Sequence, residues 1–412
     1  MAHENPPYDL VVFGATGFVG HLICRYLLEH AGTQGDLRWA VAGRSRAKLE
    51  QLVMALGPKA EHLPLLTADV TDVSTLQALC AQTRVVVSTV GPYALYGEPL
   101  VKVCAATGTD YCDLTGEVQW IRRMVQTYEA QAQQSGARIV HCCGFDSIPS
   151  DLGVYYLQQQ AQAQWGEPCM RVKMRVKAAR GGVSGGTIAS GINLVEESAV
   201  NPALRQELAN PYLLCPDGND TADHPPALIP VQYDEAFQEW ITPFVMAQVN
   251  TPIVLRSQAL LAPTYGKDFH YDEAILTGTG ALGWLVAQGV NVGLSGFVVA
   301  AAVPPTRWVL KQWVVPAPGE GPSAEAQEQG FYDLRFWGQT TTGQTIQVKV
   351  TGDRDPGYGS TAKILGQAGI CLAQDFPKSA KPGGFWTPAA MFGDRLIERL
   401  VSYAGLTFQK SS

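Results

Sequence analysis

The stretch that decides the fold is Tyr8-Asp9-Leu10-Val11-Val12-Phe13-Gly14-Ala15-Thr16-Gly17-Phe18-Val19-Gly20. Its apolar run, Leu10 to Phe13, is typical of a strand that is buried on both faces of a parallel sheet. Apolar residues then recur at helical spacing from Phe18 to Leu27, so a helix is predicted directly after the glycines. A strand, a glycine turn and a helix in this order predict a dinucleotide-binding domain.

The glycine turn leaves unpaired N–H groups at the helix N-terminus, and these groups attract a pyrophosphate together with the helix dipole. The first glycine permits a tight turn, the second lets the backbone approach the phosphates, and the third lets the helix pack closely on the strand. The spacing is G-x-x-G-x-x-G, and a tight turn in some other α/β protein is the alternative. We expect the following residues of the turn to hold the cofactor: Gly14, Ala15, Thr16, Gly17, Phe18 and Gly20.

The end of the second predicted strand, residues 37–43, indicates which dinucleotide is bound. Domains that prefer NAD usually carry Asp or Glu at this point, where the carboxylate binds the ribose hydroxyls. Here Arg44 and Ser45 follow the strand instead. Arg44 offers a planar fork for a 2′-phosphate, and Ser45 offers a hydroxyl and is also suited to cap the next helix. The sequence therefore predicts NADP as the cofactor.

The next two predicted strands place more residues at the same edge of the sheet. Residues 63–68 form the third strand, and Asp69 after it either meets the adenine ring or caps the helix that follows. The valine-rich fourth strand, 84–90, is followed by Gly91 and Pro92. Ligands of open α/β sheets bind beyond the carboxyl ends of the strands, so we expect Gly91 and Pro92 to lie over the nicotinamide.

Two further strands complete a Rossmann-type, doubly wound parallel sheet. The pattern then changes, because residues 170–178 alternate apolar and basic side chains as in a strand with one wet face. A helix is predicted at about 188–208, a loop at 210–232, and an antiparallel hairpin within 331–351. These elements indicate a second, α+β domain that is built on an antiparallel or mixed sheet.

We therefore expect a first, NADP-binding domain over residues 1–152 and an α+β substrate or dimerisation domain over 153–352. Residues 353–412 return to complete the first domain. Within them, apolar residues in helical phase predict a helix at about 388–404 that packs back on the first domain.

One segment of the second domain is unusually apolar. Residues 280–303 lie in a longer stretch without any charged side chain, and they are long enough to span about 30 Å of hydrocarbon. Gln288, Asn291 and five glycines argue against an isolated spanning helix, because lipid cannot satisfy those amides. A spanning helix, peripheral membrane contact, and a helix buried in the fold or a dimer interface are the alternatives. We favour a helix that packs on the second domain and leaves one apolar face open for lipid or a second subunit.

Composition and charge argue against several other classes of protein. The net charge of −7, without a basic block, argues against nucleic acid as a partner. Nine cysteines without a C-x-x-C pair and seven scattered histidines predict no metal site. An odd cysteine count and the absence of signal-peptide features at the first residues favour a reducing compartment. We expect a cytoplasmic homodimer that contacts the inner face of the plasma membrane.

Several motifs, taken together, resemble those of a known family. They are Val-Val-Phe-Gly-Ala-Thr-Gly-Phe at 11–18, Ala-Val-Ala-Gly-Arg-Ser at 40–45, Gly-Pro-Tyr at 91–93, Asp-Leu-Thr-Gly-Glu at 113–117 and Gly-Phe-Asp-Ser-Ile-Pro-Ser-Asp-Leu-Gly at 144–153. The chain is similar, nearly end to end, to the saccharopine dehydrogenase-like oxidoreductases, which include the mycobacterial trans-acting enoyl reductases of lipid biosynthesis. The resemblance implies NADP-dependent reduction of an enoyl or carbonyl group on an apolar or lipid-linked substrate. Several members contact membranes or lipid bodies through an apolar segment.

Two alternatives to this function are a non-catalytic NADP-binding protein that docks on membranes or a protein partner, and a saccharopine-type amino-acid dehydrogenase. For the enzyme, Tyr96 and Tyr93 are the first candidate acids, because they follow the loop expected over the nicotinamide. The alternative for both is packing or binding of the cofactor amide. Asp146, after the last strand, is a further candidate acid or else a helix cap, and Glu117 is interpreted as a cap.

Overall fold

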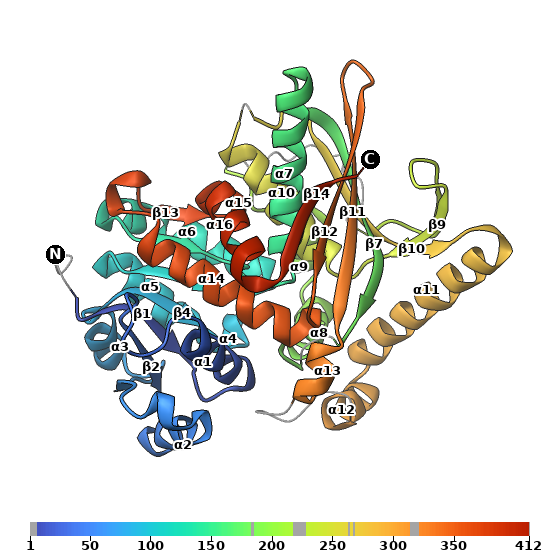
Figure 1. Ribbon diagram of the computed structural model, residues 1–412. Helices are drawn as coiled ribbons and strands as arrows, with labels where there is room; N and C mark the ends of the chain where they lie inside the picture. The colour runs from blue at the N-terminus through green and yellow to red at the C-terminus, as the bar shows by residue number, and fades with distance from the viewer. Residues whose placement is uncertain are drawn as a thin grey trace. The chain divides into compact units, whose positions relative to one another are not determined.

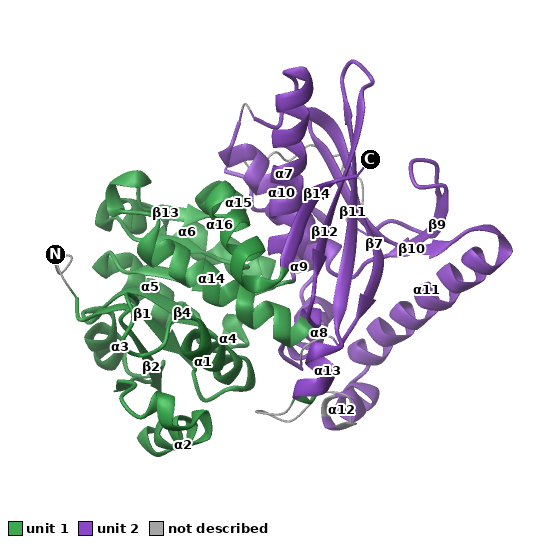
Figure 2. Ribbon diagram, viewed as in Figure 1, with its two compact units in different colours: residues 1–145, 317–323, 357–405 green, residues 146–316, 324–356, 406–412 purple. Residues whose placement is uncertain are grey.

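The computed structural model describes residues 6–182, 185–216, 228–262, 264–266, 268–313 and 321–411. The chain divides into two compact units, each with its own sheet (Figure 2). Unit 1 comprises residues 1–145, 317–323 and 357–405, and unit 2 comprises residues 146–316, 324–356 and 406–412. Within the predicted loop at 210–232, residues 217–227 lie outside the described residues.

Unit 1 is built on sheet A, whose seven strands are β1 (Tyr8–Phe13), β2 (Trp39–Gly43), β3 (Leu65–Thr67), β4 (Thr83–Ser88), β5 (Asp110–Asp113), β6 (Arg138–Val140) and β13 (Gly384–Trp386). All pairs are parallel, and the order is β13-β6-β5-β4-β1-β2-β3. Figure 1 labels β13, β4, β1 and β2 of this sheet. Apart from the edge strand β13, this is the 3-2-1-4-5-6 order of dinucleotide-binding folds. The buried run from Leu10 to Phe13 lies between β2 and β4, which explains why it is wholly apolar.

The helical segments of unit 1 are α1 (Phe18–His30), α2 (Arg46–Leu56), η1 (Pro58–Ala60), α3 (Val73–Cys80), α4 (Tyr93–Tyr96), α5 (Glu98–Thr107), α6 (Val118–Ser135), α14 (Thr361–Gln374), η3 (Lys378–Ala380), α15 (Pro388–Phe392), α16 (Asp394–Arg399) and η4 (Leu400–Ala404). Helices α1 and α14 pack on one face of sheet A, and α3, α5 and α6 lie side by side on the other. Gly369 brings α14 down onto the sheet, since a Cβ there would lie 2.5 Å from Val87 Cγ2. The predicted doubly wound parallel sheet is confirmed.

Unit 2 is built on sheet B, whose strands are β7 (Cys169–Arg180), β8 (Gln232–Asp234), β9 (Glu239–Pro243), β10 (His270–Gly278), β11 (Phe331–Thr340), β12 (Thr345–Gly352) and β14 (Leu406–Lys410). Their order is β14-β12-β11-β7-β10-β9-β8; the β7–β10 pair is parallel and its neighbours are antiparallel. Side chains of β11 alternate in burial, and Tyr332, Leu334 and Phe336 point to the covered face. The predicted hairpin and the mixed sheet of the second domain are confirmed.

The helices of unit 2 are α7 (Ile148–Trp165), α8 (Gly185–Val200), α9 (Pro202–Ala209), α10 (Ala247–Leu260), α11 (Gly280–Ala302), α12 (Pro304–Trp313) and α13 (Ala324–Glu328). Helices α7 and α10 pack together on sheet B. Gly153 allows the close approach of α7, because a Cβ there would lie 2.3 Å from Phe336 Cζ. The short π-helical turn η2 (Pro356–Ser360) begins at the last residue of one segment of unit 2.

Two predicted helices are interrupted in the structure. The helix expected at 188–208 is two helices, because Asn201 Oδ1 accepts a hydrogen bond from Leu204 N at 3.2 Å and Pro202 starts α9. The helix expected at 388–404 is broken at Gly393, whose φ of +50° ends α15. Each break has a local sequence signal, an Asn-Pro pair in the first helix and a glycine in the second. The prediction from apolar spacing alone did not take these signals into account.

The apolar segment is a helix, as predicted, but it packs less on unit 2 than we expected. In α11 only Gly283, Ala287 and Ala301 are buried, and most of the larger apolar side chains are exposed. The helix has the length and apolar composition of a membrane-spanning helix. The expectation of a helix with a single open face is therefore wrong, since these small buried residues cover only a narrow strip.

The division into units differs from the expected domain limits in four places, because residues 146–152, 353–356 and 406–412 belong to unit 2 and residues 317–323 belong to unit 1. The chain leaves unit 1 after residue 145, so α7 belongs wholly to unit 2. The C-terminal segment returns to unit 1 only as far as residue 405, because β14 pairs with β12 in sheet B.

Candidate functional site

The glycine turn after β1 forms a cradle at the N-terminus of α1. Gly14 has a φ of +86°, and a Cβ there would lie 2.7 Å from Thr89 Oγ1, so the position requires glycine. A Cβ at Gly20 would lie 2.3 Å from Gly14 O, so only glycine lets α1 begin so close to the turn. Gly17 is the N-cap of α1 and makes no side-chain hydrogen bond to the first N–H groups, which leaves these groups for an anion.

The surroundings of Gly17 fit a bound pyrophosphate. Among the described residues, a Cβ at Gly17 would meet only the turn's own backbone, at 3.4 Å, so they leave this side of the turn open. Thr16 is exposed beside it, whereas Ala15 is buried beneath the turn. Phe18 packs edge-on against Tyr358, with 5.0 Å between the ring centroids. The predicted cradle residues therefore lie together, and within the described part of the chain no side chain lies within 4 Å of a Cβ built on Gly17.

The residues after β2 fit a 2′-phosphate. Arg44 is exposed, and within the described part of the chain its guanidinium has no hydrogen-bond or ion-pair partner. Ser45 caps α2 as predicted, because its Oγ accepts a hydrogen bond from Lys48 N at 3.4 Å. The pKa of the Asp69 carboxyl is lowered by hydrogen bonds from Thr71 and, to a smaller degree, by the charge of Arg44. Arg44 and Asp69 therefore lie near each other at the carboxyl ends of β2 and β3.

Asp69 does not cap the helix that follows it. The cap of α3 is Asp72, whose Oδ1 accepts a hydrogen bond from Ser74 N at 3.0 Å. Asp69 Oδ1 instead accepts hydrogen bonds from Thr71 N and Oγ1, both at 2.9 Å, within a tight turn. The capping alternative for Asp69 is therefore wrong, and its contact with adenine stays a prediction.

A buried carboxylate holds the loop after β4. Glu117 accepts hydrogen bonds from Tyr93 N at 2.8 Å and from Ala94 N at 2.9 Å, so it caps α4. The interpretation of Glu117 as a cap is confirmed, although it caps α4 and not α6, which it precedes in the chain. Because the carboxylate is buried, these two charge-assisted bonds fix the start of α4 firmly.

The same loop is tied to the glycine turn. Thr89 Oγ1 donates a hydrogen bond to Gly14 O at 3.0 Å, which joins the carboxyl ends of β1 and β4. Gly91 and Pro92 follow, connected by a cis peptide bond, with Gly91 exposed and Pro92 half-buried. The two residues expected over the nicotinamide thus lie at the carboxyl edge of sheet A, where its strand order reverses. Sequence reasoning missed Thr89, which reads there only as part of a valine-rich strand.

The two candidate tyrosines differ sharply in environment. Tyr93 is buried, donates a hydrogen bond to Ser88 O at 3.0 Å and accepts one from Leu114 N at 3.4 Å. Burial holds the pKa of Tyr93 well above its usual range, so this phenol is a structural tie between β4 and β5. Tyr96, at the end of α4, is 45% exposed, and no described residue hydrogen-bonds to its hydroxyl. Of the two, the structure leaves only Tyr96 free to meet a substrate.

Asp146 is the first residue of unit 2, and its surroundings favour the protonated form of its carboxyl group. Its half-buried carboxyl accepts a hydrogen bond from Thr187 Oγ1 at 3.4 Å. Burial raises the pKa of Asp146 to about 6, against the opposite effect of this hydrogen bond. Neither Asp146 nor Ser147 caps α7 with its side chain, since Ser147 Oγ donates to Asn250 Oδ1 instead. The capping alternative for Asp146 is therefore wrong.

A buried contact between an aspartate and a histidine joins the ends of β5 and β6, and sequence reasoning missed it. Asp113 Oδ2 lies 2.7 Å from His141 Nδ1, and both side chains are almost fully buried. Asp113 Oδ1 also accepts hydrogen bonds from Thr115 N and from Cys142 N, whose φ is +61°. The pair fixes the backbone that leads from β6 toward Asp146. Among the residues that the structure describes, no three His, Cys, Asp or Glu side chains gather as metal ligands.

The sequence matches a known domain and several named proteins. Residues 10–140 match the saccharopine dehydrogenase NADP-binding domain. A protein of Mycobacterium tuberculosis is 43% identical over 98% of this chain and 97% of its own length, and its name gives the activity of a trans-acting enoyl reductase in provisional form. The trans-acting enoyl reductase of Mycobacterium bovis is 38% identical over 97% of both chains. That of Mycobacterium leprae is 36% identical over 98% of this chain and 97% of its own.

A solved structure shares the fold along its whole length. The apo form of saccharopine dehydrogenase (L-Glu forming) from Saccharomyces cerevisiae superposes with a TM-score of 0.55 and 12% sequence identity. The match covers 98% of this chain and 100% of the yeast chain. At this identity the similarity concerns the fold alone.

Proposed function

Because this chain belongs to the family of the trans-acting enoyl reductases, we propose that it reduces an enoyl or carbonyl group of a lipid-like substrate by hydride transfer. The chain is an NADP-dependent oxidoreductase with a saccharopine dehydrogenase NADP-binding domain. The observation that carries the proposal is the 36–43% identity to enoyl reductases over nearly the whole chain, unit 2 included. Dependence on NADP follows from membership of the family, and the proposal adds the class of substrate.

The residues of the cradle have separate tasks in holding the cofactor. We assign the pyrophosphate to the first N–H groups of α1, from Gly17 onward. We assign the 2′-phosphate to Arg44 and the Ser45 hydroxyl, and the nicotinamide end to the loop with Gly91 and Pro92. When bound, NADPH supplies the hydride.

Reduction of an enoyl group also requires a proton. The hydride adds to the β-carbon, the negative charge spreads over the α-carbon and the carbonyl oxygen, and a proton on the α-carbon completes the saturated product. The donor must be protonated in a useful fraction near neutral pH. A phenol or carboxyl group whose pKa lies near the working pH meets this requirement best.

We assign the proton to Asp146. Its pKa of about 6 keeps part of the carboxyl protonated near neutral pH, unlike an ordinary aspartate. The backbone before Asp146 is also held in place. The N–H of the preceding residue, Phe145, donates to Thr361 Oγ1 at 3.1 Å within unit 1. Tyr93 is unavailable for this role, since its hydroxyl is already hydrogen-bonded inside unit 1.

The test is NADPH oxidation by the purified protein with a long-chain 2-enoyl thioester, with the acyl product identified by mass spectrometry. We expect a saturated acyl product and one NADPH consumed per product. Above pH 6 the rate should fall, because Asp146 loses its proton. Asp146→Asn should lower the rate by about 100-fold or more at pH 6 and abolish this pH dependence, as loss of a general acid does.

Tyr96→Phe is the matched variant for the other candidate acid. It removes one exposed hydroxyl, and we expect it to retain the rate and the pH profile of the unaltered protein. A large loss in Tyr96→Phe together with an active Asp146→Asn would transfer the role to the tyrosine. NADPH binding without any consumption by enoyl or ketoacyl thioesters would contradict the proposed function itself.

A further inference from the structure

The candidate acid Asp146 is followed directly by a serine that does not make the bond its position favours. Ser147 is the N-cap residue of α7, and a serine there normally accepts a hydrogen bond from a backbone N–H of the first turn. Its side chain makes no such bond, and its Oγ donates to Asn250 Oδ1 at 3.0 Å instead. A favourable local bond is thus replaced by a contact with another helix, as happens where function constrains a residue.

Asn250 is itself held by two further hydrogen bonds. It lies inside α10, which packs against α7, and it is almost fully buried. Its Nδ2 donates to Glu273 Oε2 at 3.0 Å and to Ser150 Oγ at 3.2 Å. Together with the bond from Ser147, the oxygen and both N–H groups of this amide have partners. The amide therefore cannot turn without breaking three buried hydrogen bonds.

Glu273 decides which end of the amide faces Ser147. It lies in β10, is fully buried, and its Oε1 accepts a hydrogen bond from Tyr271 OH at 2.6 Å. Its Oε2 accepts from Asn250 in both protonation states, because the proton of the neutral carboxyl can sit on Oε1 and be donated to the Tyr271 oxygen. A reversed amide would set its oxygen against Oε2. Glu273 therefore keeps the amide oxygen of Asn250 turned toward Ser147.

The groups around Glu273 come from four elements of unit 2. Burial raises the pKa of Glu273 to about 7. Four side chains, from β10, α10, α7 and β7, act in the opposite direction: Tyr271, Asn250, Ser150 and Arg175. Because Oε2 accepts in either state, the bond to Asn250 persists on both sides of this pKa.

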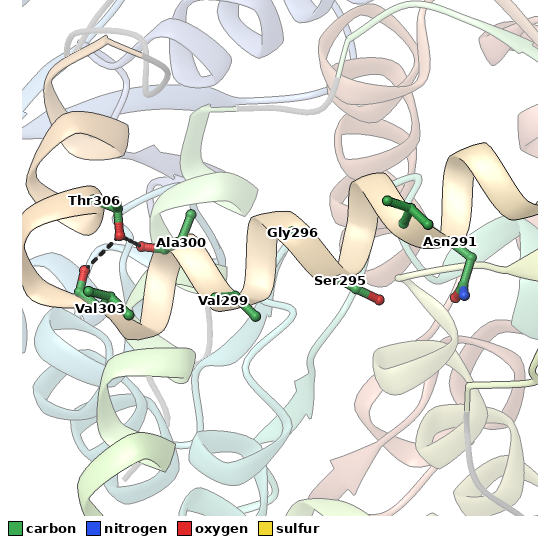
Figure 3. A pocket seen from close by; sticks show the side chains of 8 residues that line it. Asn291, Ser295, Gly296, Val299, Ala300, Val303 and Thr306 are labelled. Carbon is green, nitrogen blue, oxygen red and sulfur yellow. Dashed lines mark hydrogen bonds between the residues drawn. The ribbon is translucent and has the colours of Figure 1, made fainter.

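One groove of unit 2 offers no proton donor of its own. It runs along α11 and has a volume of about 520 Å³ (Figure 3). Its polar lining residues are Asn291, Ser295 and Thr306, and the other lining residues are apolar. No side chain that lines this groove therefore titrates near neutral pH, and the groove does not supply an alternative to Asp146.

We propose that Asn250 is a positioning residue for Asp146. By holding the Ser147 hydroxyl, it fixes the start of α7 and keeps the half-buried Asp146 carboxyl against Thr187 in α8, ready to give up a proton. Without this bond, Ser147 is free to cap α7 in the ordinary way, and the Asp146 carboxyl gains contact with water. The proposal rests on the function proposed above, in which Asp146 is the proton donor.

The test is the pKa of Asp146, measured by NMR on protein with ¹³C-labelled aspartate, in Asn250→Leu and in Ser147→Ala. In both variants it should fall from about 6 toward the ordinary value of 3.8, because the carboxyl becomes hydrated. At pH 6 a carboxyl with a pKa near 4 is protonated in about 1% of molecules, so kcat should fall more than tenfold. The affinity for NADPH should not change, because unit 1 is left unaltered.

Ser257→Ala is the matched control. Ser257 lies seven residues after Asn250 in α10, and its Oγ donates to Asp151 Oδ1 in α7 at 2.6 Å. The variant therefore breaks another buried hydrogen bond between the same two helices. Its melting temperature should fall, as in Ser147→Ala, but the pKa of Asp146 should stay at about 6.

An unchanged pKa of Asp146 in Asn250→Leu and Ser147→Ala would overturn the positioning role. An equal fall in Ser257→Ala would also overturn it, since it would show a general loosening of α7. If Asn250→Leu does not fold, the result for Ser147→Ala decides by itself. The NMR measurement needs no turnover, so the expected shifts in a protein that reduces no enoyl thioester would support the role of Asn250 and contradict only the proposed function.

Discussion

At the scale of single residues, the choice between NADP and NAD rests on Arg44. Its guanidinium is exposed at the end of β2. Arg44 stands there in place of the acidic residue that binds the ribose in NAD-dependent domains. Arg44→Ala should weaken NADPH binding by at least tenfold, since a charge-assisted phosphate contact contributes about 1.5–3 kcal/mol. NADH binding should hardly change. The measurement is a fluorescence titration with both cofactors.

Arg46→Ala is the control for this prediction. Arg46 also lies close to the end of β2, but its Nε donates to Glu50 at 2.9 Å and its Nη1 donates to Leu65 O at 3.1 Å. The side chain is thus engaged elsewhere, and the variant should keep the preference for NADPH. Equal losses of NADPH and NADH binding in Arg44→Ala would remove the assignment of the 2′-phosphate site.

Two glycines of the turn separate cofactor binding from folding. Gly17→Ala should fold normally, because among the described residues its Cβ would meet only backbone at 3.4 Å, but we expect the methyl group to occupy the place proposed for the pyrophosphate. We expect at least tenfold weaker NADPH binding and an unchanged melting temperature. Gly20→Ala should lower the melting temperature instead, since its Cβ would lie 2.3 Å from Gly14 O. Titration and thermal melting of both variants check this; normal NADPH affinity in Gly17→Ala would place the phosphates elsewhere.

At the scale of elements, a buried charge cluster holds the C-terminal part of unit 1. Asp110 at the start of β5 binds Arg138 in β6 at 2.5 Å and Lys378 in η3 at 2.6 Å. Asp110→Asn would leave the fully buried Arg138 without its counter-charge and should destabilise unit 1 by about 3 kcal/mol. Asp36→Asn, at an exposed carboxylate of the same unit, should have little effect. Urea denaturation of the two variants measures the difference; equal stabilities would contradict a structural role for the cluster.

Elements with a strong local signal were predictable from the sequence, and short edge elements were not. The run from Leu10 to Phe13 fixed β1, because only a strand buried on both faces is apolar throughout. By contrast, β13 and β14 are short strands at sheet edges, and their pairing partners are far away in the sequence. A segment of five residues such as Leu406–Lys410 carries no signal that it pairs with β12 in sheet B and does not belong to unit 1.

The residues of the candidate site also fall into two groups, those that the sequence predicts and those that only the structure reveals. The glycine turn and the Ser45 cap of α2 were predictable, because backbone geometry demands those residue types at fixed spacing, whereas the phosphate contact of Arg44 stays a prediction. The Asp113–His141 pair and the Thr89 bond to the turn were not, since each depends on which strands are neighbours in sheet A. For Tyr93 the sequence left both an acid and a packing role open, because it does not show that the hydroxyl donates to Ser88 O inside unit 1.

At the scale of the whole molecule, a buried carboxyl makes the stability depend on pH. Glu273 in β10 is fully buried among Tyr271, Asn250 and Ser150, and burial raises its pKa from 4.5 to about 7. The folded state binds more protons than the unfolded state between these values, so stability should fall as the pH rises from about 4.5 to about 7. The loss should approach about 3 kcal/mol at pH 8.

Glu273→Gln tests this dependence, because glutamine mimics the neutral carboxyl at every pH. Its melting temperature should exceed that of the unaltered protein above pH 7, and the two should converge near pH 4.5. Glu61→Gln, at an exposed position, should show no such pattern. An identical pH profile in Glu273→Gln and the unaltered protein would mean that this carboxyl does not titrate between pH 4.5 and 7.

The most direct test of the whole account follows the hydride itself. NADPH carrying deuterium at the transferred position of the nicotinamide is mixed with the protein and a long-chain 2-enoyl thioester, and the product is examined by mass spectrometry and NMR. The account predicts one deuterium on the β-carbon of a saturated acyl chain and a proton from solvent on the α-carbon. A product without deuterium, or no product from a protein saturated with NADPH, would contradict it.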